Sequence, residues 1–200
     1  PDRPALRPAY QGSNPISDVW SLQALRMVAR SLVRAVEDPD NDEARAEMIL
    51  AASYAGVGFG NAGVHLPHGM SYPVSGHVRE YRAPGYSADH AIVPHGMSVI
   101  LNAPAVFRFT AAASPARHLQ AAEALGVDVS LVVEADAGRV LAERITWFMD
   151  RLHVPNGLRA VWQGEEAVRM SWPGGLTLSG AAEINGGGLP RTVVRFGGAE

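Results

Sequence analysis

Apolar positions recur at three- and four-residue steps over most of the first 160 residues, which is the spacing of amphipathic helices. The clearest case follows Asn14 and Pro15, because an asparagine side chain can cap a helix and proline suits its first position. The pattern predicts a first helix that ends at Asp38-Pro39. The apolar positions of this helix are Val19, Leu22, Leu25, Val28, Ala29, Leu32, Val33 and Val36.

The same spacing predicts further helices, separated by proline and glycine breaks. They are expected over about 42–54, 63–76, 94–109, 115–125 and 134–152, with a loop over 79–93. No alternation of strands and helices occurs, which excludes a complete doubly wound nucleotide-binding sheet. The chain is therefore expected to be all-α, a helical bundle.

Residues 56–63 contain four glycines, at positions 56, 58, 60 and 63. Glycine has no side chain to keep two backbones apart, so the run predicts a kink or a tight helix crossing. The surrounding stretch 48–78 has no Asp, Glu, Lys or Arg and is longer than a membrane span. Asn61, His65 and His68 would be costly in lipid, so we expect a buried helix pair and no membrane contact.

The helical period disappears past about Arg169. The last thirty residues hold eight of the chain's 21 glycines, with short Thr, Val and Leu runs that predict at most a weak hairpin. We therefore expect a helical domain over 1–170 and a Gly-rich, disordered or irregular tail over 171–200.

Composition narrows the function classes. With 200 residues, 47% hydrophobic and 18% charged, the chain suffices for one domain or a piece of a larger protein. A formal net charge of −3 with no basic block argues against nucleic acid as a partner. The absence of cysteine leaves His, Asp and Glu as the strong metal ligands available. No charged or apolar leader opens the chain, so the expected location is cytoplasmic.

Histidines cluster in the middle of the chain. His68 and Tyr72 are four residues apart and share a helical face, and a loop could bring His95 back to His68. Two imidazoles make an incomplete site, because divalent ions usually take three or four protein ligands. A partial metal site and ordinary core or capping histidines both remain open on spacing alone. Five of the seven histidines lie in this region: His65, His68, His77, His90 and His95.

Two motifs carry a family resemblance. Residues 58–73 read Gly-Phe-Gly-Asn-Ala-Gly-Val-His-Leu-Pro-His-Gly-Met-Ser-Tyr-Pro, and Val93-Pro94-His95-Gly96 follows. Together they closely resemble the iron-containing (group III) alcohol dehydrogenases and, within them, the hydroxyacid-oxoacid transhydrogenases. The resemblance covers most of residues 8 to 160.

The resemblance implies the C-terminal metal-binding helical domain of this family, without the N-terminal domain that binds most of the NAD. It also implies one divalent ion, Fe(II) or Zn(II), held by an upstream Asp and His and by two later histidines that match His68 and His95. No Asp of this chain has a His four positions on, so the upstream pair is expected before Pro1.

Tyr72 lies four residues after His68. Many alcohol dehydrogenases of the family have a further histidine at this position. The transhydrogenases resemble this chain in that tyrosine and in the long loop before His95. Tyr72 is therefore a candidate catalytic residue that could hydrogen-bond the cofactor or substrate. Three arginines are candidates for binding anionic substrates: Arg79, Arg82 and Arg108.

The implied reaction is hydride transfer from 4-hydroxybutyrate to 2-oxoglutarate through bound NAD, with the metal lowering the pKa of the substrate hydroxyl. The partners are then a small hydroxy acid, oxo acid or alcohol, and a homo-oligomer is left open. In a eukaryote the expected location becomes mitochondrial. The alternatives are an iron-type NAD-dependent alcohol dehydrogenase and an inactive, truncated helical module. A hydrolytic metalloenzyme is disfavoured because no His-Glu-x-x-His element occurs.

Overall fold

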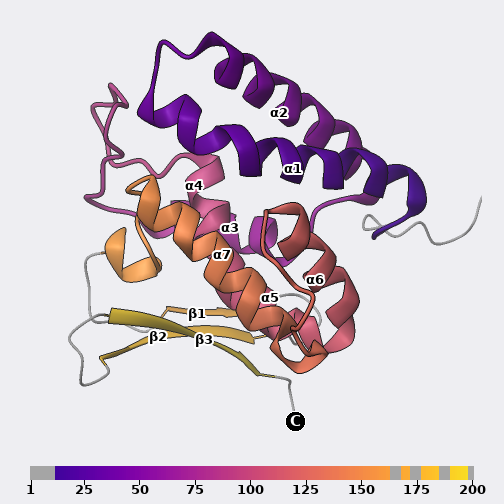
Figure 1. Cartoon of the computed structure of the whole chain (residues 1–200). Helices are drawn as coiled ribbons and strands as arrows, with labels where there is room; N and C mark the ends of the chain where they lie inside the picture. The colour runs from indigo at the N-terminus through magenta and orange to yellow at the C-terminus, as the bar shows by residue number, and fades with distance from the viewer. Residues whose placement is uncertain (1–11, 163–167, 172–176, 185–189, 198–200) are drawn as a thin grey trace, which may run out of the picture.

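A computed structural model of the chain describes residues 12–162, 168–171, 177–184 and 190–197. Its first part is helical, in agreement with the all-α class expected from the sequence (Figure 1). The helices are α1 (Pro15–Glu37), α2 (Asp42–Ala62), α3 (Leu66–His77), α4 (His95–Ile100), α5 (Ala103–Thr110), α6 (Pro115–Ala124) and α7 (Ala137–Arg151), with 3-10 turns η1 (Ala111–Ala113), η2 (Glu134–Asp136) and η3 (Leu158–Ala160).

Helices α1 and α2 form a hairpin along one side of the bundle (Figure 1). The Asn14 side chain accepts a hydrogen bond from the Ser17 amide at 3.0 Å, which confirms the predicted cap of α1. Helix α2 extends eight residues beyond the expected end at 54, because the glycine run stays helical. At Gly58 a Cβ would overlap the Ser21 hydroxyl, so this glycine allows the tight crossing that the sequence suggested.

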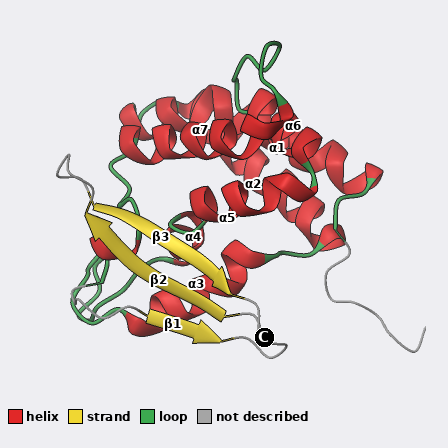
Figure 2. Ribbon diagram, turned by 90° about the horizontal axis from the view of Figure 1, so that it is seen from below, coloured by secondary structure: helices red, strands yellow, loops and turns green. Residues whose placement is uncertain are grey.

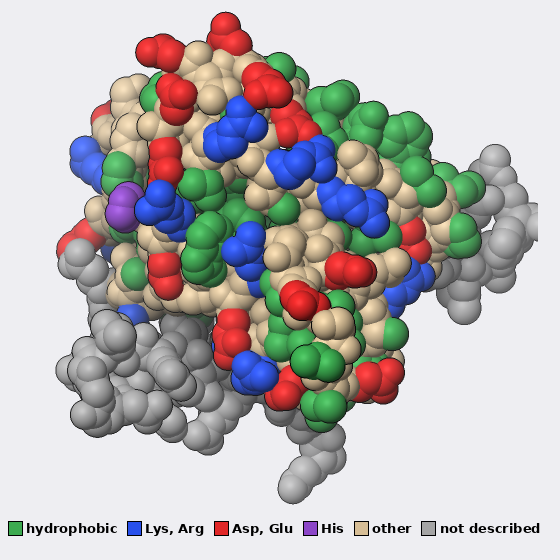
Figure 3. All heavy atoms as spheres, in the orientation of Figure 1, with side chains coloured by type: hydrophobic (Ala, Val, Ile, Leu, Met, Phe, Trp, Pro, Cys, Tyr) green, Lys and Arg blue, Asp and Glu red, His purple; other side chains and the backbone are tan. Residues whose placement is uncertain are grey.

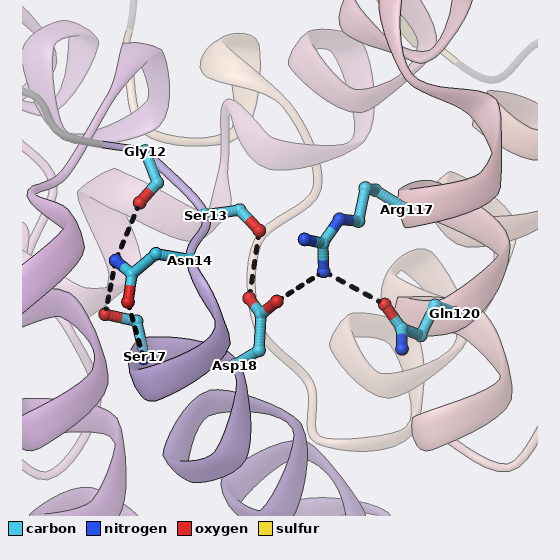
Figure 4. Close-up of polar contacts among 7 residues, drawn as sticks. All are labelled: Gly12, Ser13, Asn14, Ser17, Asp18, Arg117 and Gln120. Carbon is cyan, nitrogen blue, oxygen red and sulfur yellow. Dashed lines mark hydrogen bonds and ion pairs between the residues drawn. The ribbon is translucent and has the colours of Figure 1, made fainter.

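Polar contacts join the beginning of α1 to α6 (Figure 4). Asp18 accepts hydrogen bonds from the Ser13 hydroxyl at 2.9 Å and from Arg117 of α6 at 2.6 Å. Arg117 also donates to Gln120 at 3.2 Å. At the other end of α1, Glu37 pairs with Arg151 of α7 at 2.6 Å. These pairs are partly exposed, so each contributes roughly 0–1 kcal/mol and serves mainly to orient the helices.

Helix α7 supplies the centre of the hydrophobic core. It packs against α5 and α6, and its apolar face shares one buried cluster with residues of α3, of the loop after α3 and of the segment that follows α4. The indole N–H of Trp162 donates to the Val74 carbonyl of α3 at 3.0 Å, which ties the segment after α7 to the same helix. The core residues are Val74, Val78, Val93, Leu101, Ala122, Leu125, Leu141, Ile145, Phe148, Met149, Leu158 and Val161.

The tail differs from the irregular segment expected from the sequence. Strands β1 (Val168–Ser171), β2 (Thr177–Ile184) and β3 (Pro190–Gly197) form an antiparallel sheet in the order β1-β2-β3. The sheet lies on the side of the bundle opposite α1 and α2 (Figures 1 and 2). The physical reason is strand propensity. The run Thr-Val-Val-Arg-Phe over 192–196 is rich in β-branched and aromatic residues, and the whole of β3 pairs with β2 at eight positions.

Charges of both signs are interspersed on the face of the bundle shown in Figure 3. Several belong to ion pairs between helices, such as Arg34 of α1 with Glu43 of α2 at 2.7 Å. Among the described residues, one stretch, His95–Ala113, is long and apolar enough to span a membrane by length and composition. The structure divides that stretch into α4, α5 and η1, and 39% of it is buried within the fold.

Gly138 of α7 lies close to α5 and η1. A Cβ at this position would lie 2.7 Å from the Ala111 Cβ and 2.9 Å from the Phe107 carbonyl oxygen. We expect Gly138→Ala to lower the free energy of unfolding by about 1–3 kcal/mol, because backbone must move to accept the methyl group. Urea unfolding measures the change.

Gly56→Ala is the matched control, because no atom lies within 4 Å of a Cβ there. It should leave stability unchanged or raise it by roughly 0.5–1 kcal/mol through helix propensity. Equal unfolding midpoints for the two variants would contradict the close packing of α5 on α7.

Candidate metal centre

Two histidines lie in the first turns of α3 and α4. His68 follows Pro67 in the first turn of α3, and His95 is the first residue of α4, directly after Pro94. Proline suits the beginning of a helix, since its missing N–H would have no intrahelical partner there. The loop 78–94 returns the chain from the end of α3 to the beginning of α4, so both first turns meet at one place.

The rings of His68 and His95 are close enough to share an ion. Their centroids are 5.4 Å apart with an interplanar angle of 58°. Two imidazoles on one tetrahedral ion, each with a metal–nitrogen bond of about 2.0–2.1 Å, have centroids roughly 5 Å apart. The donor type also fits, because neutral imidazole is a ligand for Fe and Zn alike. The structure therefore brings together the two residues that the resemblance implies as ligands.

Protonation favours the ligating form of this pair. Burial lowers the pKa of His68 below its usual value, and the nearby His95 lowers it further. His65, three residues earlier, also has a lowered pKa, mainly through burial and then through the charges of His68 and His118. A lowered histidine pKa keeps the ring neutral near pH 7, which is the form that binds metals.

The pair is only part of a metal site. Within residues 12–162 and the three strands, no group of three or more His, Cys, Asp or Glu is placed to hold an ion. Further ligands are needed, because a stable site for such an ion usually has three or four protein donors. The upstream Asp and His expected from the family resemblance would fill that gap.

Tyr72 lies beside the histidine pair. Its side chain is 71% exposed, and its ring centroid is 6.5 Å from that of His95. The phenol is therefore accessible to a molecule bound next to the two histidines. The sequence prediction that Tyr72 and His68 share a helical face agrees with their positions on α3.

The loop before α4 is held by its own contacts. The Tyr81 hydroxyl donates to the Met97 sulfur at 3.5 Å, and the Ile92 amide donates to the Tyr81 carbonyl at 2.8 Å. Burial raises the pKa of the Tyr81 hydroxyl, so it stays protonated. These contacts connect the loop to α4 close to His95.

The candidate arginines have different surroundings. Arg79 donates to the carbonyls of Gly76 and Val78, and Arg82 donates to the Asp89 carbonyl at 2.9 Å. Both guanidinium groups therefore stabilise the loop. Arg108 instead lines a hollow between α5 and α7. The other residues of that hollow are Ala111, Ala112, Pro115, Glu134, Ala135, Gly138 and Arg139.

The remaining histidines have separate partners. His77 packs edge-on against Trp162 with centroids 6.0 Å apart, and His90 bonds Asp89 at 2.8 Å. His118 is half-buried in the first turn of α6, and its ring bonds the Thr110 hydroxyl at 3.0 Å.

Sequence analysis missed two serines at the site. Ser71 donates a hydrogen bond to the His68 carbonyl at 2.6 Å, and Ser98 donates to the His95 carbonyl at 2.7 Å. Both hydroxyls are buried. The signal that could have found them is the tetrapeptide His-Gly-Met-Ser, which occurs at both 68–71 and 95–98.

Comparison with known proteins identifies the family. Residues 9–171 match the profile described as Fe-containing alcohol dehydrogenase family, C-terminal. The chain belongs to this family, whose name records an iron ion.

Two curated relatives match most of this chain. The chain is 60% identical over 168 residues to "Hydroxyacid-oxoacid transhydrogenase, mitochondrial" of Xenopus tropicalis, covering 84% of this chain and 36% of that protein. It is 58% identical over 161 residues to the Homo sapiens protein of the same name, covering 80% of this chain and 34% of that protein. The chain thus spans about a third of the length of these relatives.

Solved structures agree on the fold. A 1,3-propanediol oxidoreductase matches with a TM-score of 0.66 and 28% identity, covering 78% of this chain and 38% of that one. An alcohol dehydrogenase from Oenococcus oeni matches with a TM-score of 0.65 and 24% identity over 76% of this chain and 36% of that one, which concerns the fold alone.

The pKa of His68 provides a direct test of the pair. We expect His68 to titrate below the usual 6.5, and His95→Gln to raise its pKa part of the way back, because burial persists after the neighbouring charge is removed. Proton NMR of the imidazole resonances measures both values. His77→Gln, on the last residue of α3, should leave the pKa of His68 unchanged. If His95→Gln leaves the pKa of His68 at its value in the unaltered chain, the two rings do not lie close enough to interact.

Proposed function

We propose that this chain is the metal-binding part of a hydroxyacid-oxoacid transhydrogenase. The observation that carries the proposal is the meeting of His68 and His95 at the first turns of α3 and α4. The identity of 60% over 168 residues to a protein of that name supports the particular activity. The substrates would be 4-hydroxybutyrate as hydride donor and 2-oxoglutarate as acceptor.

His68 and His95 would hold the ion through neutral ring nitrogens, with the other ligands supplied by residues outside those described. The family name favours Fe(II), and the same donors accept Zn(II). When bound, the ion supplies Lewis-acid chemistry that makes a substrate hydroxyl more acidic. The half-buried position of His68 limits competition from water and keeps its ring unprotonated.

Tyr72 would act on bound substrate or cofactor as a hydrogen-bonding group. Its exposed phenol lies on the same side of α3 and α4 as the histidine pair, with its ring centroid 6.5 Å from that of His95. A phenol can donate one hydrogen bond and also accept, so it suits an alcohol, a carboxylate or a nicotinamide amide.

The chain would work as one part of a longer enzyme. Most NAD contacts would come from the portion of the relatives' length that this chain does not span. The division into a helical domain over 1–170 and a separate tail over 171–200 is supported by the family match, which ends at residue 171. The relatives' names include "mitochondrial", which supports a mitochondrial location if the source is a eukaryote. For any other source, the cytoplasm stays the expected location.

An iron-type NAD-dependent alcohol dehydrogenase is the second candidate. It is favoured by the 28% identity to a 1,3-propanediol oxidoreductase over most of this chain. The two candidates differ in the fate of the reduced cofactor. A transhydrogenase returns the hydride to an oxo acid, whereas an alcohol dehydrogenase releases NADH and needs added NAD for each turnover.

The activity can be tested by grafting. The 168 matched residues of the Xenopus tropicalis protein are replaced by their counterparts from this chain, and the hybrid is loaded with Fe(II). Succinate semialdehyde formation from 4-hydroxybutyrate should require 2-oxoglutarate and no added NAD. His68→Ala or His95→Ala should reduce turnover by at least about 100-fold, because each removes a ligand of the ion.

His90→Ala is the control, since His90 lies on the exposed loop and bonds only its neighbour Asp89 among the contacts described. It should retain turnover. Turnover that depends on added NAD would favour the alcohol dehydrogenase, and a folded hybrid with no turnover would favour an inactive module.

Tyr72→Phe in the same hybrid tests the role of the phenol. We expect turnover to fall by about 10-fold or more, the cost of one hydrogen bond to a polar substrate, with unchanged metal content. Steady-state kinetics and metal analysis measure the two quantities. Because the side chain is exposed, stability should not change. Full activity in the Phe variant would exclude Tyr72 from the reaction.

A further inference from the structure

The tetrapeptide His-Gly-Met-Ser occurs twice in this chain, each time directly after a proline. The first copy covers 68–71 in α3, and the second covers 95–98 in α4. Both copies have the same local geometry, because the serine hydroxyl bonds the carbonyl of the histidine three residues before it. The repetition links the serines to His68 and His95, whose ring centroids are 5.4 Å apart.

The two hydrogen bonds are short and protected. The Ser71 hydroxyl lies 2.6 Å from the His68 carbonyl oxygen, and the Ser98 hydroxyl lies 2.7 Å from that of His95. The residues are 1% and 0% exposed, respectively. A buried hydroxyl without a partner is costly, so each serine is held to its carbonyl.

These bonds fix the backbone from which each imidazole projects. The bonded carbonyl and the ring belong to the same residue, so the serine restrains the peptide plane next to the histidine Cα. Helix α4 has only six residues, and a helix of that length is marginal without added contacts. The side-chain amide of Asn102 donates a hydrogen bond to the Ser98 carbonyl at 2.8 Å and so extends the restraint to the start of α5.

We propose that Ser71 and Ser98 are positioning residues for a divalent cation bound by His68 and His95. By binding the two histidine carbonyls, they hold the imidazoles at the separation that one ion requires. The proposal rests on the proposed function, in which His68 and His95 are metal ligands. It assigns a role to two side chains that do not touch the ion themselves.

The test is Co(II) binding by the hybrid enzyme described above, in which the relative's own residues can supply the remaining ligands. Co(II) substitutes for Fe(II) and Zn(II), and its visible absorption reports the geometry of its ligands. The dissociation constant is measured by competition with a chromophoric chelator, and the melting temperature is measured without metal. Ser71→Ala and Ser98→Ala should each weaken Co(II) binding about fivefold and change the absorption of the saturated complex.

Ser53 provides a matched control. Its hydroxyl also bonds a carbonyl of its own helix, that of Ile49 at 3.1 Å, but in α2. Ser53→Ala should leave both the Co(II) dissociation constant and the spectrum unchanged. If Ser71→Ala or Ser98→Ala does not fold, Ser71→Gly and Ser98→Gly replace them, because glycine also removes the hydroxyl and adds no metal ligand.

The outcomes separate this inference from the proposed function. Unchanged Co(II) affinity and spectrum in the folded serine variants would overturn the positioning role, even if their melting temperatures fall. A change in Co(II) affinity no larger than that caused by Ser53→Ala would also overturn the positioning role. His68→Ala and His95→Ala should each abolish the signal, and binding that survives both would instead overturn the metal site itself.

Discussion

The packing of α7 determines where the candidate site lies. Its buried face holds Val74 of α3 and Leu101, the residue after α4, in one hydrophobic cluster. Because both helices contact the same core, their first turns are fixed relative to each other, and His68 and His95 meet with centroids 5.4 Å apart. Helices α3 and α4 also contact each other directly, and the 78–94 loop joins them, so the shared core, this helix contact and the loop together set the separation of the two rings.

Local signals in the sequence were sufficient for most of the helical bundle. Asn14 and Pro15 marked the beginning of α1, and prolines marked those of α4 and α6, whereas the single helix expected over 94–109 is divided into α4 and α5. The end of α2 was missed, because glycines usually interrupt helices, whereas this run stays helical and Gly58 packs closely against Ser21 of α1. The tail was expected to be irregular, yet it contains three paired strands. Strand pairing is non-local, so a search for periodicity along the sequence does not find it.

The candidate site could be predicted only in part. Spacing alone suggested a metal site at His68 and His95 but left open that both are ordinary core or capping histidines. The family resemblance favoured the metal site. Ser71 and Ser98 were missed because buried serines have no periodic signature, and their role depends on a hydrogen bond to a backbone carbonyl. Tyr72 was found by its spacing from His68, but its exposure required the structure. The proposed site has two candidate donors among the described residues, so a complete site would need groups outside them.

The central claim is that His68 and His95 bind the same ion. Crystals of the hybrid described above, grown with Fe(II), would test it through the anomalous scattering at the iron absorption edge. The account predicts one strong peak within about 2.0–2.3 Å of a ring nitrogen of both His68 and His95. A peak bound to only one of them, or an iron located elsewhere with both rings free, would contradict it.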